Sequence, residues 1–195
     1  MIDLVVAILM DIYTKRIKLG VGYGTPVVAV NHVTLAAVAS AIRSKKISVE
    51  MTTVIPKGFA RYVPSQKMLQ LSSHDNVNAS SFQNDTSVRA MVIHECVHAH
   101  VHMNRPNTPI LIDESAAFLT QTLYRMLAGD TAFVKQATSG KNANARIFSA
   151  CVGIVDMWLR PPATRPNLSR TELNPLFQAF AGHKLYKQAA AAYPL

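Results

Sequence analysis

The segment His94-Glu-Cys-Val-His98 constrains the fold of this chain more than any other. Apolar residues recur around it at three- to four-residue spacing over residues 85–103, which predicts a helix. Residues at i and i+4 lie about 40° apart on one helix face, so both imidazoles can converge on a single metal ion. Because apolar neighbours flank the motif, this helix face is expected to be partly buried, and the rest of the chain must pack around it.

The spacing of the motif suggests a catalytic zinc site. Imidazole nitrogen suits Zn²⁺, and catalytic zinc takes three protein ligands and a water molecule. Glu95 follows the first histidine directly, where its carboxylate can reach that water as a general base. The competing explanations are coincidence, expected in roughly one sequence in 200 of this composition, and a helix whose histidines are simply satisfied within the core.

Glu114 is the best candidate for a third ligand. Two prolines forbid continuation of the first helix, and a second helix is expected over residues 113–129. If the two helices pack antiparallel, Glu114 returns over the face that carries His94 and His98. Glu114 is otherwise a first-turn carboxylate stabilised by the helix dipole, with Asp113 as the cap. Asp113 is also a candidate for supporting a ligand by a hydrogen bond.

Four further histidines bear on the ligand set. His102 lies four residues after His98 and is an alternative ligand, whereas His100 points away from the motif face. His74 and His183 lie in or near expected loops, and either can approach from elsewhere in the fold. A fourth protein ligand such as His102 or His74 would close the site and indicate a structural role.

The remaining pattern predicts a single α+β domain over residues 1–195 that is mostly helical. It comprises an N-terminal segment (1–33), a sheet with the metal-binding helices (34–129) and a helical C-terminal part (130–195). No regular element is predicted in the first part, and its glycines lack the spacing of a nucleotide-binding loop. Period-two alternation predicts two or three strands, expected to form a small antiparallel or mixed sheet. The strands are expected at 47–54, 59–63 and 67–72, and further helices at 34–45, 143–159, 174–181 and 183–192.

Composition excludes several classes of protein. With 49% hydrophobic and 16% charged residues, the chain has enough apolar material for a core, which excludes wholesale disorder. The longest apolar run, residues 4–10, is too short to span a membrane and is preceded by an aspartate rather than a cation, so no secretory signal is expected and a cytoplasmic location is predicted. Cys96 and Cys151 are too few for a disulfide framework and are expected to be buried, reduced thiols.

Twenty Lys and Arg against eleven Asp and Glu give a net charge of +9. Such an excess can reflect contact with nucleic acid, an anionic membrane or an acidic partner. The cations are spread along the chain with small clusters at 15–18 and 43–46, so a generally basic, solvated surface is the expectation. A nucleic-acid-binding role is not expected, because no binding motif is present and only 7% of residues are aromatic.

The motif followed by Asp113-Glu-Ser-Ala-Ala117 resembles the gluzincins, the zincin metallopeptidases whose third ligand is a glutamate. The resemblance spans about residues 59–129 and implies a zincin-like fold with a small sheet packed on the motif helix. It implies Zn²⁺ held by His94, His98 and Glu114, with Glu95 as general base and acid. It also implies a peptide or protein substrate that lies along an edge strand, at 59–63 or 67–72.

The chain departs from the known branches of that family. Val101 and Asn104 stand where metzincins have glycine and histidine, and Phe118 stands where thermolysin-like enzymes have an aspartate. Gluzincins usually have a downstream Tyr or His donor, for which three residues are conceivable here: Tyr124, His183 and Tyr186. The expected function is a zinc-dependent metallopeptidase. The alternatives are a non-catalytic, metal-stabilised binding or scaffold module and a zincin-type effector toxin.

Overall fold

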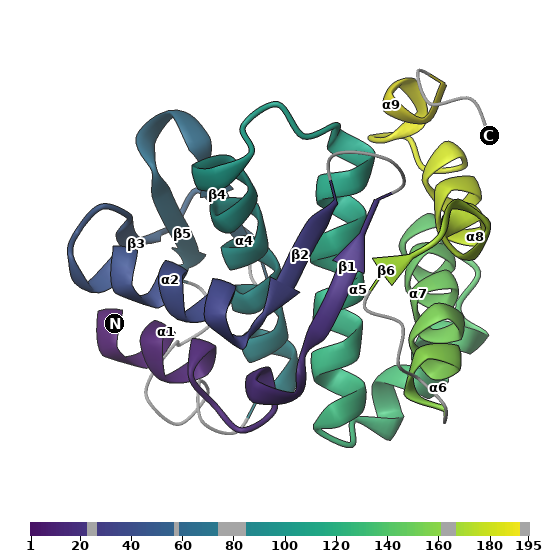
Figure 1. The fold of residues 1–195 in the computed structure, drawn as a ribbon, viewed down its shortest axis with the longest axis horizontal. Coiled ribbons are helices and arrows are strands. Elements are labelled where there is room, and N and C mark those ends of the chain that lie inside the picture. The colour runs from purple at the N-terminus through teal and green to yellow at the C-terminus, as the bar shows by residue number, and fades with distance from the viewer. Residues whose placement is uncertain (23–26, 57–58, 74–84, 161–166, 192–195) are drawn as a thin grey trace.

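The computed structural model of the chain describes residues 1–22, 27–56, 59–73, 85–160 and 167–191 (Figure 1). The fold is α+β and mostly helical, as expected. Two long antiparallel helices form its centre, accompanied by two small three-stranded sheets and a group of helices at the C-terminal end. Among the helices of these ranges, none combines the length and the apolar character needed to cross a bilayer.

The central pair consists of α4 (Thr86–Asn104) and α5 (Ile110–Leu127), which pack against each other over much of their length. Asp85 caps α4 by accepting hydrogen bonds from the backbone N–H groups of Ser87 and Val88. α5 begins three residues earlier than predicted, directly after Pro109, because proline is tolerated where a helix begins. Asp113 therefore lies inside the first turn of α5 and is not its cap.

One sheet contains β3 (Ser48–Thr52), β5 (Met68–Ser72) and β4 (Ala60–Val63), in that order. β4 pairs antiparallel with β5, whereas β3 and β5 are parallel, so the sheet is mixed, which is one of the two arrangements expected. The register places β5 in the middle of the sheet. Of the two segments considered for an edge strand, 67–72 is therefore central, and only 59–63 contains one. β4 packs on α4.

The second sheet lies where no element was predicted. β1 (Lys18–Val21) pairs antiparallel with β2 (Val28–Asn31) and parallel with β6 (Asn167–Leu168), which comes from the far end of the chain. Three of the four residues of β1 are buried, so it lacks the alternation of a half-exposed strand. In β2 the burial does alternate, but its exposed position is Ala29, so the sequence shows no apolar–polar alternation. Two helices and a 3₁₀ turn accompany them: α1 (Ile2–Leu9), η1 (Thr14–Arg16) and α2 (His32–Arg43).

The C-terminal part is helical, as expected. It contains α6 (Thr131–Ser139), α7 (Ala143–Leu159), α8 (Arg170–Ala181) and α9 (Lys187–Ala191). α7 agrees with the prediction and α6 was not predicted. α8 begins four residues early because Ser169 and Glu172 form a capping box, and within the described residues α9 is shorter than predicted.

One hydrophobic cluster runs from α1 through both central helices to α8. Cys96 and Cys151 are buried free thiols, as expected.

Candidate metal centre

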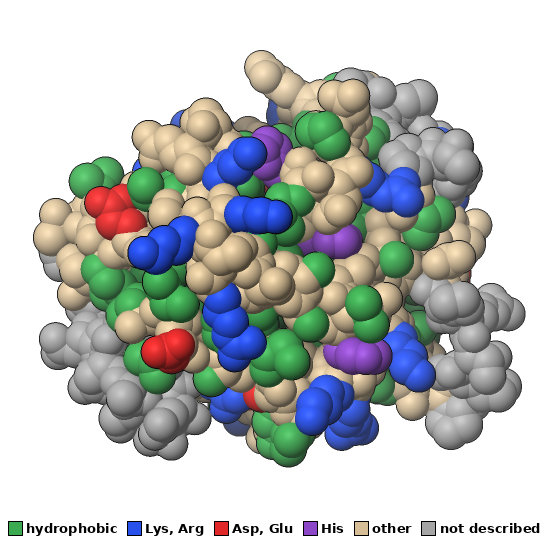
Figure 2. Space-filling view, turned by 60° about the vertical axis from the view of Figure 1, so that its left-hand side comes forward, with side chains coloured by type: hydrophobic (Ala, Val, Ile, Leu, Met, Phe, Trp, Pro, Cys, Tyr) green, Lys and Arg blue, Asp and Glu red, His purple; other side chains and the backbone are tan. Residues whose placement is uncertain are grey.

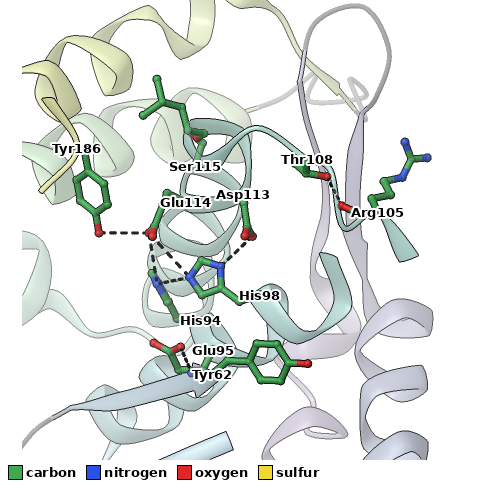
Figure 3. A network of polar contacts seen from close by, with 11 residues as sticks. Tyr62, His94, Glu95, His98, Arg105, Thr108, Asp113, Glu114, Ser115 and Tyr186 are labelled. Atoms are coloured by element: carbon green, nitrogen blue, oxygen red, sulfur yellow. Dashed lines mark hydrogen bonds and ion pairs between the residues drawn. The ribbon is translucent and has the colours of Figure 1, made fainter. Parts of the chain in front are cut away.

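The structure brings His94, His98 and Glu114 together between the two central helices (Figure 3). The histidine Nε2 atoms lie 3.2 Å apart, and Glu114 Oε2 lies 3.9 Å from each of them. Ligands at about 2.0–2.1 Å from a tetrahedral ion are about 3.3 Å apart, so small shifts would complete a metal site. Among the described residues, this is the group of three whose ligand atoms all lie within 4.8 Å of one another.

The antiparallel pairing of α4 and α5 produces this convergence. His94 and His98 lie one turn apart on α4 and face α5, and Glu114 lies near the N-terminal end of α5. The three side chains are largely buried, with exposed fractions of 11%, 17% and 16%. A metal bound here would therefore be largely shielded from water on the side of the helices.

His98 is held by a second contact on the far side of its ring. Asp113 Oδ1 lies 2.8 Å from His98 Nδ1, which leaves Nε2 directed at the other two ligand atoms. Burial alone would lower the pKa of His98, but the hydrogen bond with Asp113 and the neighbouring carboxylates outweigh it and raise that pKa to about 9. Without a metal ion, His98 is thus a cation between carboxylates.

His94 has the opposite electrostatic character. Burial and the adjacent charge of His98 lower the pKa of His94 well below its usual value, so its ring is neutral. The ring of Phe118 packs edge-on against it at a centroid distance of 4.7 Å. A neutral imidazole keeps one unprotonated ring nitrogen, which is the form that binds a metal ion.

Glu95 lies beside the histidine pair and does not belong to the group of three. Its Oε2 accepts a 2.7 Å hydrogen bond from the backbone N–H of Tyr62, on edge strand β4 (Figure 3). Burial raises the pKa of Glu95 to about 7, against the lowering effects of His98 and of the Tyr62 N–H. A carboxyl group with this pKa can take up and return a proton near neutral pH.

Of the three residues considered as a downstream donor, Tyr186 reaches the centre. Its hydroxyl donates to Glu114 Oε2 at 3.3 Å, and its ring packs on Phe180. Tyr124 instead donates to Asp11 at the other end of α5, and His183 contacts Asn144. Tyr186 precedes α9, so the C-terminal part of the chain completes this side of the site.

The other histidines lie apart from the three ligand atoms. His102 Nδ1 lies 3.2 Å from the Tyr62 hydroxyl, and His100 contacts Asn104. The predicted alternatives of His102 as a ligand or as the closing fourth ligand therefore do not agree with its contacts, while His74 lies outside the described residues. Sequence reasoning missed Tyr62 altogether, because a backbone N–H group leaves no signature in the sequence.

Comparisons of the chain with family models, with curated proteins and with solved structures each found no match.

Proposed function

We propose that this protein is a zinc-dependent peptidase in which Glu95 is the general base. The observation that carries the proposal is the convergence of two histidine nitrogens and one glutamate oxygen beside a carboxyl group whose pKa lies near 7. The described residues offer three donors, which leaves a coordination position for water or substrate. A structural zinc site is usually closed by four protein ligands, so the open position favours catalysis over a purely structural role.

His94, His98 and Glu114 would hold the ion, and two nitrogens with one carboxylate oxygen are a set that Zn²⁺ accepts. When bound, zinc supplies a polarised carbonyl and a water molecule of lowered pKa. Asp113 keeps the His98 ring turned toward the site, and Tyr186 fixes the Glu114 carboxylate. Each of the two side chains that contact these ligands thus restricts how the ligand can rotate.

Glu95 would take the proton of the attacking water and return it to the leaving amine. Its carboxyl group is anchored by the Tyr62 N–H, which favours the charged form and fixes its direction. The same strand, β4, is an edge on which an extended peptide can add through its outward backbone groups other than the Tyr62 N–H. Strand β4 would therefore hold the general base and the substrate peptide in fixed positions relative to each other.

The test compares Glu95→Gln with the parent chain for zinc content and for cleavage of a mixed peptide library followed by mass spectrometry. We expect about one zinc per chain in both proteins, and cleavage at least about 10²-fold slower in the variant. Glu50→Gln, on the exposed side of β3, is the matched control and should cleave like the parent. Cleavage that persists in Glu95→Gln would rule out the assigned base. Zinc in both proteins without any cleavage would favour the metal-stabilised binding module instead.

A further inference from the structure

Most acidic residues of the described chain form hydrogen bonds or ion pairs with other residues of the chain. They cap helices, pair with arginines or line the metal centre, and only a few face solvent freely. Those engaged in this way are Asp11, Asp85, Glu95, Asp113, Glu114, Asp130, Asp156 and Glu172. The basic side chains, in contrast, are mostly exposed, and Figure 2 shows a face on which lysine and arginine far outnumber acidic residues. The positive net charge is therefore carried mainly by exposed side chains.

One corner of the molecule combines these charges with exposed aliphatic side chains. Met10, Ile12, Lys15 and Arg16 surround the turn that links α1 to η1, and Lys18 opens β1 directly after it. The exposed Val33, near the start of α2, lines one pocket with Lys18 and so belongs to the same corner. We define the basic corner as these six residues. None of its three cations forms an ion pair with a described acidic residue.

The aliphatic members of the corner are exposed to an unusual degree. Ile12 is 67% exposed, Val33 62% and Met10 44%. Burial would be the default for side chains of this size, and here they stand among lysines and an arginine. Exposed hydrocarbon side chains next to cations match the surface of a lipid bilayer. The acyl boundary accepts the hydrocarbon side chains, and the anionic headgroups accept the cations.

We propose that the basic corner binds the surface of an anionic membrane. Its aliphatic side chains favour this partner over nucleic acid, which would call for stacking aromatics or hydrogen-bond donors in their place. Tyr13, the one aromatic residue of this turn, is half-buried and packs against Tyr124. The corner would thus lie on the headgroups, with Ile12 inserted below them.

The corner is tied rigidly to the helices of the metal centre. Asp11 lies within its turn, binds Arg89 of α4, and accepts a 2.6 Å hydrogen bond from Tyr124 of α5. Tyr124 lies ten residues after Glu114, or about 15 Å along the helix axis. Figure 1 shows η1 near one end of α5 and the start of α5 at the other. A bound corner would therefore hold the metal centre at the end of the helix pair remote from the membrane.

The test is co-sedimentation of the full chain with vesicles of phosphatidylcholine alone or with 30% phosphatidylserine. We expect binding to the anionic vesicles that falls from 0.1 to 0.5 M salt, because screening shortens the reach of the headgroup charge. Each cation near such a surface contributes about fivefold, so the triple variant Lys15→Gln/Arg16→Gln/Lys18→Gln should bind about 100-fold more weakly. Ile12→Ser should lose about tenfold through lost apolar burial.

Matched controls distinguish binding by the basic corner from binding caused by net charge alone. Lys135→Gln/Lys141→Gln/Arg146→Gln removes the same three charges from exposed positions on α6, α7 and their connection, and Val54→Ser alters an equally exposed aliphatic side chain elsewhere. Both should bind within about threefold of the parent. Equal losses in the two triple variants, or equal binding to uncharged vesicles, would overturn the proposal. So would a corner triple variant that weakens binding to a 30-nucleotide DNA strand but leaves vesicle binding intact. His98→Ala should bind vesicles normally, so this test stands apart from the peptidase.

Discussion

Asp113 Oδ1 contacts His98 Nδ1 on the side of the ring opposite the nitrogen that faces Glu114. Two consecutive residues of α5, Asp113 and Glu114, thus approach the two nitrogens of one imidazole from opposite sides. The aspartate expected four residues after the glutamate in thermolysin-like enzymes is Phe118 here, and its ring packs on His94 instead.

Asp113→Ala should weaken zinc binding by about 10–100-fold, because an unsupported imidazole loses its fixed orientation and some of its basicity. Asp113→Asn should lose less, since the amide oxygen still accepts a hydrogen bond from His98. Zinc affinity is measured by competition with a chromophoric chelator. Asp3→Ala, an exposed site on α1, is the control and should match the parent. Unchanged affinity in Asp113→Ala would show that the contact does not support the ligand.

Tyr186→Phe should lower kcat by at least about tenfold while leaving the fold intact. The variant keeps the ring that packs on Phe180 and removes only the hydroxyl that donates to Glu114. Loss of a donor at a charged ligand loosens the ligand and removes a group able to stabilise developing charge. Peptide cleavage kinetics check this result, with Tyr13→Phe as the control. A kcat equal to that of the parent would confine Tyr186 to packing.

The helix pair and the convergence of its two histidines with Glu114 were predictable because both follow from local signals. The i, i+4 spacing places two histidines on one face, and prolines after the helix force the chain to reverse, which returns Glu114 over them. Asp113 was predicted to support a ligand by a hydrogen bond, but the histidine that it contacts was not identified. Its contact depends on α5 beginning at Ile110, and helix ends are set by capping details that sequence patterns locate poorly.

The strands of the first sheet were predicted without their order, and the second sheet was missed. Period-two patterns mark a half-exposed strand such as β4, whereas three of the four residues of β1 are buried, so its sequence shows no alternation. Its partner β6 lies about 150 residues away in sequence, and no local pattern encodes such a pairing. The role of Tyr62 rests on that same kind of long-range geometry.

Asp11→Ala should lower the free energy of unfolding by about 2–4 kcal/mol. The change leaves Arg89 and the Tyr124 hydroxyl with a lost partner in a largely buried place, and it frees two backbone N–H groups of the η1 turn. Asp156→Ala removes a carboxylate from an exposed i, i+4 pair with Arg160 and should cost at most about 0.5 kcal/mol. Urea denaturation measures both variants. Equal losses would mean that the Asp11 cluster contributes no more than a surface pair.

The metal-free protein should lose stability as the pH rises from about 6.5 to 9. The pKa of His98 is raised from 6.5 to about 9 in the folded state, so its contribution is fully present below pH 6.5 and disappears as the pH passes 9. Glu95 acts in the same direction at lower pH, since its pKa is raised from 4.5 to about 7. The folded chain thus binds more protons than the unfolded chain across this window, and stability falls with pH by about 2–4 kcal/mol.

Urea denaturation of chelator-treated protein at pH 6.5, 7.5, 8.5 and 9.5 measures this slope. His98→Gln should flatten most of the upper half of the curve, whereas His32→Gln, at an exposed position, should leave it unchanged. Zinc-loaded protein should also lack the slope, because a bound metal ion holds His98 deprotonated throughout. A parent curve that is flat between pH 7.5 and 9.5 without metal would mean that Asp113 does not stabilise a charged His98.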